Sequence, residues 1–289
     1  MRRDKDWKEQ LKEIKILEST QNLKWIDSHA HYNVRQYNDD RSDLIKNLEN
    51  ELELIINCGT NTKSNKETIS LCNDYNLISG VIGYFPCDTL ELENDPTKLD
   101  LLESQCKNNK ILGIGEIGLD YHWNSVGYGK DVIKGEKAIE IQKKWFIKQI
   151  ELANKLKLPI CIHSRDAEKD TLEILKNNKP LYGAIIHCYA YGLESAKEYV
   201  DMGFYFGIGG TSTYKNNTSL QEAIKYIPIE QILLETDAPY LTPEPNRRKR
   251  NDSSQIKFVI KKIAELKNLS EDDVIKITNK NVKKAYKIN

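Results

Sequence analysis

The sequence predicts an α/β fold of the (β/α)8 TIM-barrel class. Eight short apolar runs recur along the chain, and helical patterns of roughly 10–20 residues separate them. Together they span about 240 residues, close to the ~250 residues typical of such barrels. A doubly wound sheet is the rival fold, but no G-x-G-x-x-G opens a helix and no G-x-x-x-x-G-K-[ST] is present. The barrel is therefore the fold we expect.

The expected strands are brief and are either rich in β-branched residues or bounded by glycine, as buried parallel strands are. They lie at 25–28, 53–58, 77–83, 110–116, 158–163, 183–188, 203–208 and 231–236. The expected helices lie at 42–52, 64–75, 96–108, 136–157, 166–178, 192–202, 215–227 and 253–267. Their expected N-caps include Ser42, Ser64 and Asp166, whose side-chain oxygens can accept unpaired backbone N–H groups.

Two further helices flank the barrel in this interpretation. Residues 4–18 have an amphipathic pattern, and residues 271–288 form a final helix with Ser270 as its cap and three acidic residues in its first turn. No internal repeat or linker divides the chain. We therefore expect an N-terminal helical extension at 1–24 and a single barrel domain at 25–289.

Composition excludes several classes of protein. No apolar run reaches the ~18–20 residues that a membrane span requires. The charged N-terminus lacks the apolar segment of a secretion signal. The six cysteines show no C-x-x-C spacing, which argues against a disulfide framework and a zinc ribbon. We expect a reduced, cytoplasmic protein with no membrane and no obligate protein partner.

The charge balance is even overall but uneven along the chain. There are 43 basic and 43 acidic residues, yet 247–289 carries 13 Lys or Arg against 5 Asp or Glu. This basic end either contacts phosphates or forms a solvated helical face.

The five histidines are concentrated near strand ends. His29 and His31 end the first strand, His163 ends the fifth and His187 the sixth, while His122 lies in the loop after the fourth. Barrel enzymes place their active sites at the carboxyl ends of the strands. The side chains of His29 and His31 point to one face of the strand, with their Cβ atoms about 6.6 Å apart. A metal ion can lie between two imidazoles at that separation.

Carboxylates extend this set. Glu116 ends the glycine-flanked fourth strand, and Asp237 ends the eighth, with Glu235 on the same face. An acid at the end of a buried strand is costly unless it is paired. Four imidazoles and two carboxylates suffice for two divalent ions with a bridging carboxylate.

The motifs that contain these residues resemble the TatD family of metal-dependent deoxyribonucleases in order and spacing. They are His29-Ala30-His31, Gly115-Glu116-Ile117-Gly118-Leu119-Asp120-Tyr121, Ile162-His163-Ser164-Arg165-Asp166-Ala167, His187-Cys188-Tyr189 and Glu235-Thr236-Asp237-Ala238-Pro239-Tyr240-Leu241-Thr242-Pro243. The resemblance implies an amidohydrolase-type barrel that cleaves phosphodiesters and trims DNA from the 3′ end. The metal-ligand positions it matches are His29, His31, Glu116, His163, His187 and Asp237. The chain departs from the family at Phe85, where a histidine is usual.

The mechanism we expect uses two divalent cations (Mg²⁺, Mn²⁺ or Zn²⁺) that share Glu116 and a bridging water. Two nearby cations lower the pKa of that water enough to supply hydroxide. Glu116 and Asp237 are the expected catalytic residues, with Asp237 accepting the proton of the water as general base. The reaction we expect is 3′-to-5′ exonucleolytic hydrolysis of DNA.

Substrate contacts are expected on the loops that surround the strand ends. A long loop at 117–135 carries aromatic residues that can stack on unpaired bases, and arginines can grip phosphates. The expected partner is DNA, single-stranded or at a 3′ end. The candidate contacts are Tyr121, His122, Trp123, Arg165, Tyr240, Arg247, Arg248 and Arg250.

Two alternatives stay open at this stage. The same metal cage serves hydrolases of lactones, amides or aminoacyl esters, so the ligands alone do not select the substrate. A barrel of this kind can also bind nucleic acid without catalysis.

Overall fold

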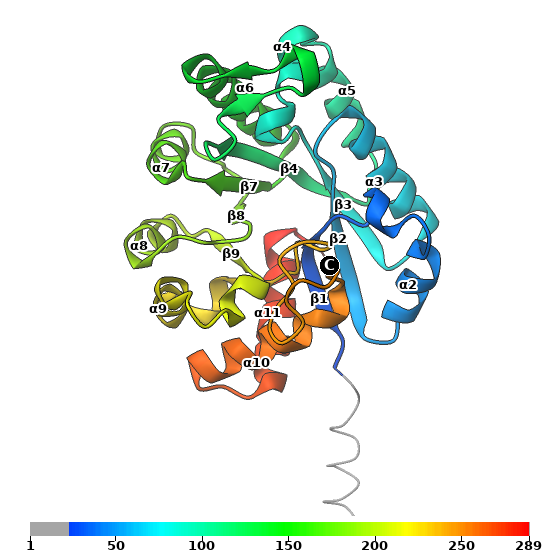
Figure 1. Ribbon diagram of the computed structural model, residues 1–289, viewed down its shortest axis with the longest axis vertical. Helices are drawn as coiled ribbons and strands as arrows, with labels where there is room; N and C mark the ends of the chain where they lie inside the picture. The colour runs from blue at the N-terminus through cyan, green and yellow to red at the C-terminus, as the bar shows by residue number, and fades with distance from the viewer. Residues whose placement is uncertain (1–22, 289) are drawn as a thin grey trace, which may run out of the picture.

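The computed structural model describes residues 23–288. Its centre is a parallel sheet of eight strands, in which each main strand pairs with the next one along the chain (Figure 1). The helices surround this sheet, as the class predicted from the sequence requires. The strands are β1 (Trp25–Ala30), β2 (Leu52–Cys58), β3 (Ile78–Ile82), β4 (Ile111–Asp120), β7 (Ile160–Arg165), β8 (Ala184–Ile186), β9 (Tyr205–Ile208) and β10 (Ile232–Leu234).

Backbone hydrogen bonds between β1 and the segment that follows β10 close the barrel at its rim. The amide of Asp237 donates to the carbonyl of His29 at 2.9 Å, and the amide of His31 donates to the carbonyl of Ala238 at 2.7 Å. The eight-stranded barrel is therefore confirmed, and its closing seam lies beside two of the expected site residues.

The helices follow the predicted alternation, with differences at their ends. The predicted helix at 96–108 is one clear departure, because regular helix begins only at Lys98 and a separate short helix precedes it. The helices are α2 (Arg41–Leu48), α3 (Thr62–Asp74), α4 (Leu90–Asn94), α5 (Lys98–Gln105), α6 (Glu136–Leu156), α7 (Glu168–Asn177), α8 (Leu193–Asp201), α9 (Thr218–Tyr226), α10 (Ile256–Lys267) and α11 (Glu271–Ala285).

Capping follows the prediction at only one of the four expected positions. The Ser270 hydroxyl accepts a first-turn backbone N–H of α11 at 3.1 Å, as expected. Ser42 lies inside α2, and Asp166 precedes α7 without capping it. Asn61, rather than Ser64, caps α3, and the two residues bond reciprocally in a capping box.

The inner end of the barrel is apolar and is closed by α11. Side chains from several strands, such as Ile26, Val81 and Leu233, form one cluster with Val282 and Tyr286 of α11. The predicted helix at 4–18 lies outside the described residues.

The segment predicted as one long loop at 117–135 is partly regular structure. β4 continues to Asp120 because residues 117–120 pair in register with 162–165 of β7. Beyond it, β5 (Ser125–Val126) and β6 (Ile133–Lys134) form a short antiparallel pair. The loop prediction was therefore wrong at its start, and the remaining segment is a small hairpin on the rim.

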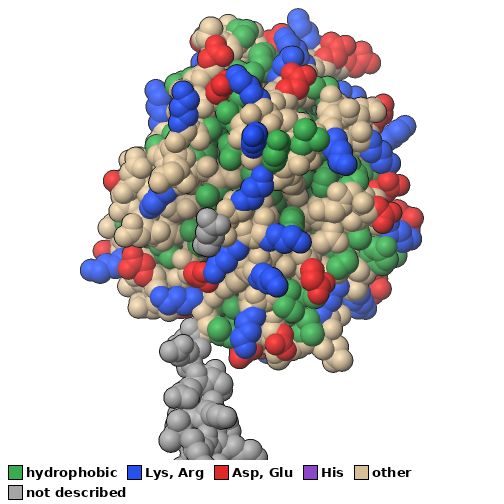
Figure 2. Space-filling model, turned by 180° about the vertical axis from the view of Figure 1, so that it is seen from behind, with side chains coloured by type: hydrophobic (Ala, Val, Ile, Leu, Met, Phe, Trp, Pro, Cys, Tyr) green, Lys and Arg blue, Asp and Glu red, His purple; other side chains and the backbone are tan. Residues whose placement is uncertain are grey.

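The surface carries charges of both signs. Figure 2 shows the face opposite to that of Figure 1, where Lys and Arg side chains are spread among Asp and Glu. In the basic C-terminal segment, Lys262 pairs with Glu265 and Lys283 pairs with Glu53, which fits a solvated helical face. No helix within residues 23–288 has both the length and the apolar character of a membrane span.

Candidate metal centre

The structure brings all six sequence-predicted metal-ligand residues into one buried cluster at the carboxyl ends of the strands. His29 is the next-to-last residue of β1, Glu116 lies in β4, and His163 lies in β7. His187 directly follows β8, and Asp237 follows β10. Four parts of the barrel wall and its closing seam thus point their side chains toward the same point.

His29, His31 and Asp237 form one half of the cluster. The Nε2 atoms of the two histidines lie 3.1 Å apart. Asp237 Oδ1 lies 3.3 Å from His31 Nε2 and 3.7 Å from His29 Nε2. One ligand atom from each residue lies within 4.8 Å of the other two, so a single cation can contact all three.

His163, His187 and Glu116 form the other half. Glu116 Oε1 lies 2.8 Å from His163 Nδ1 and 3.2 Å from His187 Nε2. The second oxygen of the same carboxylate, Oε2, lies 3.7 Å from His29 Nε2 and 3.6 Å from His31 Nε2. Glu116 therefore stands between the two halves and turns one oxygen toward each.

Burial and charge set the protonation of these groups. Burial by itself would raise the pKa of Glu116, but the charge of His187 and hydrogen bonds from the histidines hold that pKa well below its usual range. Burial lowers the pKa of His187, yet Glu116 and Glu235 outweigh it and raise that pKa well above its usual value. Burial, together with the charge of His187, lowers the pKa of His29. Glu116 is thus an ionised carboxylate surrounded by the side chains of the four histidines.

The donor set fits divalent metal ions. Imidazole nitrogens and carboxylate oxygens are ligands of Zn²⁺ and Mn²⁺, and such ions are held best where several donors already converge. Glu116 is 3% exposed and His29 is fully buried, so water has little access to the ligand atoms of these two residues. A cation is the group that this arrangement of lone pairs suits.

Asp27, which the sequence reasoning overlooked, holds the seam below the centre. Its carboxylate accepts the hydroxyls of Thr236 and Ser253, both at 2.6 Å. It also accepts the backbone amides of His29 at 3.2 Å and Thr236 at 3.1 Å. Burial raises the pKa of Asp27 to about 7. Asp27 therefore fixes β1 and the Asp237 segment relative to each other.

Each of the four histidines has a neighbour close to the nitrogen that faces away from the centre. Cys161 Sγ lies 3.4 Å from His29 Nδ1, and the thiol is otherwise part of the barrel filling, as expected. Asp120, which the sequence reasoning had placed in a loop, contacts His163 Nε2 at 3.0 Å. Glu235 Oε1 lies 3.3 Å from His187 Nδ1. Glu235, predicted to share a face with Asp237, also faces the clustered histidines, because one of its oxygens lies within 4.8 Å of ligand atoms of His29 and His187.

The match to a family model decides the classification of this chain. The model described as "TatD related DNase" matches residues 26–287, nearly the whole of the described barrel. The chain belongs to the TatD-related DNase family.

Curated relatives in this family span the same length. The uncharacterized metal-dependent hydrolase YabD of Bacillus subtilis is 37% identical over 266 residues, which cover 91% of this chain and 99% of that protein. The uncharacterized metal-dependent hydrolase MG009 of Mycoplasma genitalium is 32% identical, with 91% and 99% covered.

Solved structures show the same fold. YjjV, a TatD homologue from Escherichia coli, superimposes with a TM-score of 0.81 at 22% identity and covers 92% of this chain and 99% of its own. A TatD-family hydrolase from Entamoeba histolytica gives a TM-score of 0.77 at 23% identity, with 91% and 98% covered.

Exposed aromatic and basic side chains stand on the rim of the TatD-family barrel. Trp123 is 61% exposed, with the Arg165 guanidinium 6.0 Å from its ring centroid. His122 packs edge-on against Trp123, and its Nδ1 lies 3.2 Å from Asp166. Within residues 23–288, Arg165 forms no ion pair, so its charge is open to an anionic ligand.

Tyr240 and the loop after β10 line another part of the rim. Tyr240 is 47% exposed, and its ring centroid lies 6.2 Å from that of His31. Arg247 stacks on Tyr214 at 4.2 Å, and Arg248 is exposed with a φ of 75°. Of these side chains, Tyr240 lies beside a clustered histidine, whereas Arg247 also pairs with Glu244 at 3.9 Å.

Two of the expected substrate contacts are engaged elsewhere. The Tyr121 hydroxyl donates to Asp170 at 2.7 Å, so its polar end is directed toward α7. Arg250 forms hydrogen bonds of 2.8 and 2.6 Å with the Asp40 carboxylate and donates to the carbonyl of Gln36. Both contacts favour structural roles.

Phe85, the departure from the usual TatD sequence, lies beside the centre. Its ring meets that of His163 edge-on, with the centroids 4.6 Å apart. The aromatic side chain therefore gives the rim next to this half of the centre an apolar wall.

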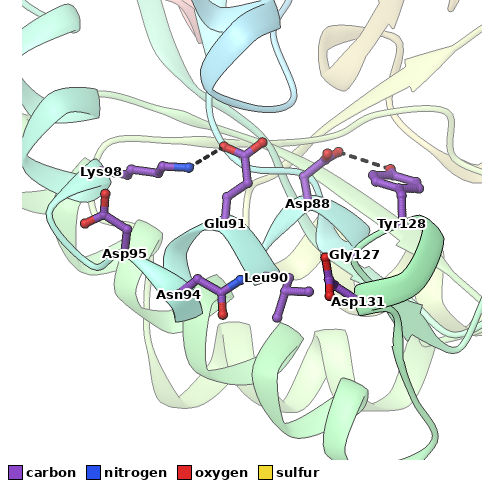
Figure 3. Close-up of a pocket in the computed structure, with 9 residues that line it drawn as sticks. All are labelled: Asp88, Leu90, Glu91, Asn94, Asp95, Lys98, Gly127, Tyr128 and Asp131. Atoms are coloured by element: carbon purple, nitrogen blue, oxygen red, sulfur yellow. Dashed lines mark hydrogen bonds and ion pairs between the residues drawn. The ribbon is translucent and has the colours of Figure 1, made fainter.

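A separate cavity lies next to the rim, and four of the nine residues that line it are acidic (Figure 3). It has a volume of about 370 Å³, and none of the six clustered residues lines it. Asp88 is 6% exposed and accepts hydrogen bonds from Asn61 at 3.2 Å and Tyr128 at 3.4 Å. Tyr128 belongs to the rim hairpin, so this contact joins the hairpin to the barrel.

We expect Asp88→Asn to change the pH dependence of stability. Burial raises the pKa of Asp88 from 3.8 to about 7, so the folded protein holds a proton that the unfolded chain releases. The stabilisation from this proton is complete below about pH 4 and is lost as the pH rises through 7. The unfolding free energy of the variant minus that of the wild type should therefore be about 2–3 kcal/mol larger at pH 8 than at pH 5.

Urea unfolding of EDTA-treated protein at both pH values measures this difference. Asp131→Asn, at an exposed position of the same cavity, is the control and should show no such gain. An equal difference between wild type and Asp88→Asn at both pH values would contradict the assignment.

Proposed function

We propose that this chain is a divalent-metal-dependent deoxyribonuclease that removes nucleotides from the 3′ end of DNA. Membership of the TatD-related DNase family and relatives named as metal-dependent hydrolases support hydrolysis. The observation that carries the choice of substrate is the exposed rings of Trp123 and Tyr240 near the centre, together with the Arg165 guanidinium, which forms no ion pair within residues 23–288. Unpaired bases stack on aromatic rings, and phosphates bind guanidinium groups.

The two halves of the centre support binding of two cations. Each half offers three donor residues, counting Glu116 in the second, and Glu116 has an oxygen directed to each half. When bound, divalent cations lower the pKa of water and neutralise charge that develops on a phosphoryl oxygen. The ions we propose are Mg²⁺, Mn²⁺ or Zn²⁺.

Asp237 is the residue placed to accept a proton from the attacking water. Its side chain is 16% exposed, whereas that of Glu116 is 4% exposed, so water reaches Asp237 more easily. Burial would raise the pKa of Asp237, but the hydrogen bond from His31 and the charges of the histidines outweigh it and lower that pKa. The carboxylate is therefore ionised and able to act as a general base.

The protein's own side chains then orient the substrate. Trp123 and Tyr240 offer ring faces to the terminal bases, and Arg165 holds a phosphate near the centre. Phe85 offers an apolar ring edge-on beside His163. The closed seam at Asp27 keeps His29 and Asp237 in register during the reaction.

A cleavage assay tests the proposal directly. A single-stranded oligonucleotide labelled at its 5′ end is incubated with purified protein in EDTA or with added Mg²⁺, Mn²⁺ or Zn²⁺. We expect a ladder of products shortened from the 3′ end, only with metal, and arrest at a 3′ phosphorothioate linkage. Hydrolysis of an aminoacyl ester or lactone without any DNA cleavage would instead support a carbon substrate. Retention of the oligonucleotide without products would indicate a binding protein.

We expect Trp123→Ala and Arg165→Gln to weaken binding of single-stranded DNA through different forces. Loss of one stacking ring costs ~1–3 kcal/mol, so Trp123→Ala should raise KM roughly 5- to 100-fold with little change in kcat. Arg165→Gln should make the slope of the logarithm of the binding constant against the logarithm of the salt concentration shallower by about 0.7. Arg250→Gln is the control, because Arg250 is already paired with Asp40. Equal slopes for all proteins would remove Arg165 from the substrate site.

We also propose a cytoplasmic location. The six cysteines, all within residues 23–288, are unpaired thiols, which is the usual state in a reducing compartment.

A further inference from the structure

The four clustered histidines differ in what lies behind them. The outer nitrogen of His31 contacts the carbonyl oxygen of Cys58 at 3.1 Å, and that of His29 contacts the Cys161 thiol at 3.4 Å. The outer nitrogens of the other two histidines face carboxylates instead. One half of the centre therefore has uncharged partners, and the half that contains His163 and His187 has anionic ones.

Asp120 is held rigidly behind His163. It ends β4, is 1% exposed, and its Oδ1 accepts the backbone amide of Trp123 at 3.1 Å. Gln142 of α6 bonds both the amide of Asp120, at 2.9 Å, and its carbonyl, at 3.1 Å. The remaining oxygen, Oδ2, is the one that lies 3.0 Å from His163 Nε2. The carboxylate is thus in position through contacts that do not involve the centre.

Glu235 occupies the corresponding place behind His187. It is fully buried, and its Oε1 accepts the amide of Cys188 at 2.6 Å. The same Oε1 lies 3.3 Å from His187 Nδ1, within ion-pair distance, but neither that nitrogen nor Glu235 Oε2 has a hydrogen-bond partner among residues 23–288. Only a glycine fits at 207, because a Cβ there would collide with the Glu235 carboxylate. The fold therefore leaves space for the buried Glu235 carboxylate, but it supplies hydrogen bonds to only one of the two carboxylate oxygens.

Burying a carboxylate costs free energy unless a charged partner compensates it. A structural role alone does not require a charge at either position, since amides of the same shape accept the same backbone N–H groups. A carboxylate behind an imidazole fixes the proton on the outer nitrogen and leaves the inner lone pair free and more basic toward a cation.

We propose that Asp120 and Glu235 are positioning residues that fix the rings of His163 and His187 and thereby set the affinity of their half of the centre for a divalent cation. The inference rests on the metal centre of the proposed function but is independent of its substrate.

Calorimetric titration of the full chain with Mn²⁺, after removal of metal with EDTA, tests this proposal. The wild type should bind two ions. Asp120→Asn and Glu235→Gln keep the side-chain shape and remove the charge, and each should weaken one binding event by about 10- to 100-fold while leaving the other unchanged. His163→Ala should abolish that same event, which identifies it. Cys161→Ala, behind His29, is the matched control and should leave it unchanged.

Thermal unfolding of the metal-free variants separates this role from a structural one. We expect melting temperatures near that of the wild type, and if one variant fails to fold, the other decides. Unchanged Mn²⁺ affinities at both sites, or an equal loss at both sites with a lower melting temperature, would overturn the proposal. Absence of DNA cleavage by a wild-type protein that binds two Mn²⁺ ions would instead contradict only the proposed substrate.

Discussion

Replacing Asp237 with asparagine is expected to lower the turnover of DNA hydrolysis by roughly 10²–10⁴-fold while the fold remains intact. The amide has the shape of the carboxylate but cannot accept a proton from water. Asp237 is the more accessible of the two clustered carboxylates and is ionised, so no neighbour within the centre replaces it in this role. Single-turnover cleavage of the labelled oligonucleotide with saturating Mn²⁺ measures the effect.

Circular dichroism and metal content of the Asp237→Asn variant are the controls. The variant should keep the wild-type spectrum and still bind cations through the remaining donors. Near-normal turnover by a folded, metal-loaded variant would reject Asp237 as the general base.

Glu116→Gln is expected to have the largest effect of any single substitution. Glu116 lies within 3.7 Å of all four clustered histidines and is the carboxylate with an oxygen directed to each half of the centre. Without its charge, a cation bound in either half would lose the anionic ligand that Glu116 would supply. Turnover should fall by more than about 10³-fold, and the number of Mn²⁺ ions bound should drop below two.

Glu103→Gln provides a matched control for Glu116→Gln. Glu103 is a surface residue paired with Lys155, and its replacement should alter neither the metal content nor the turnover. Binding of two Mn²⁺ ions with wild-type affinity by Glu116→Gln would show that the carboxylate does not bridge the two halves.

The barrel could be predicted from sequence because its strands are apolar through most of their length. The run at 53–58, for example, reads as a strand in isolation and is one. The ends of β4 and β10 could not be predicted in this way. β4 is lengthened by pairing with β7, and β10 ends at Leu234, two residues short of the predicted end. Both features depend on neighbours that are distant in sequence.

The clustered residues were accessible to sequence reasoning because histidines are few and lie at strand ends. Asp120 was missed because it was placed in a loop, although it lies four residues after Glu116 and contacts the same histidine. Asp27 was missed because its partners, Thr236 and Ser253, are more than 200 residues away. The roles of exposed arginines could not be predicted from sequence. Arg250, for example, forms an ion pair with Asp40, which lies 210 positions earlier in the chain and is brought next to it only by the fold.

Anomalous scattering from crystals grown with Mn²⁺ tests the central claim most directly. We predict two peaks about 3.5–4 Å apart at the carboxyl ends of the strands. One should be ligated by His29, His31 and Asp237 and the other by His163 and His187, with Glu116 between them. Peaks elsewhere, or no peak within reach of Glu116 at saturating Mn²⁺, would contradict the account.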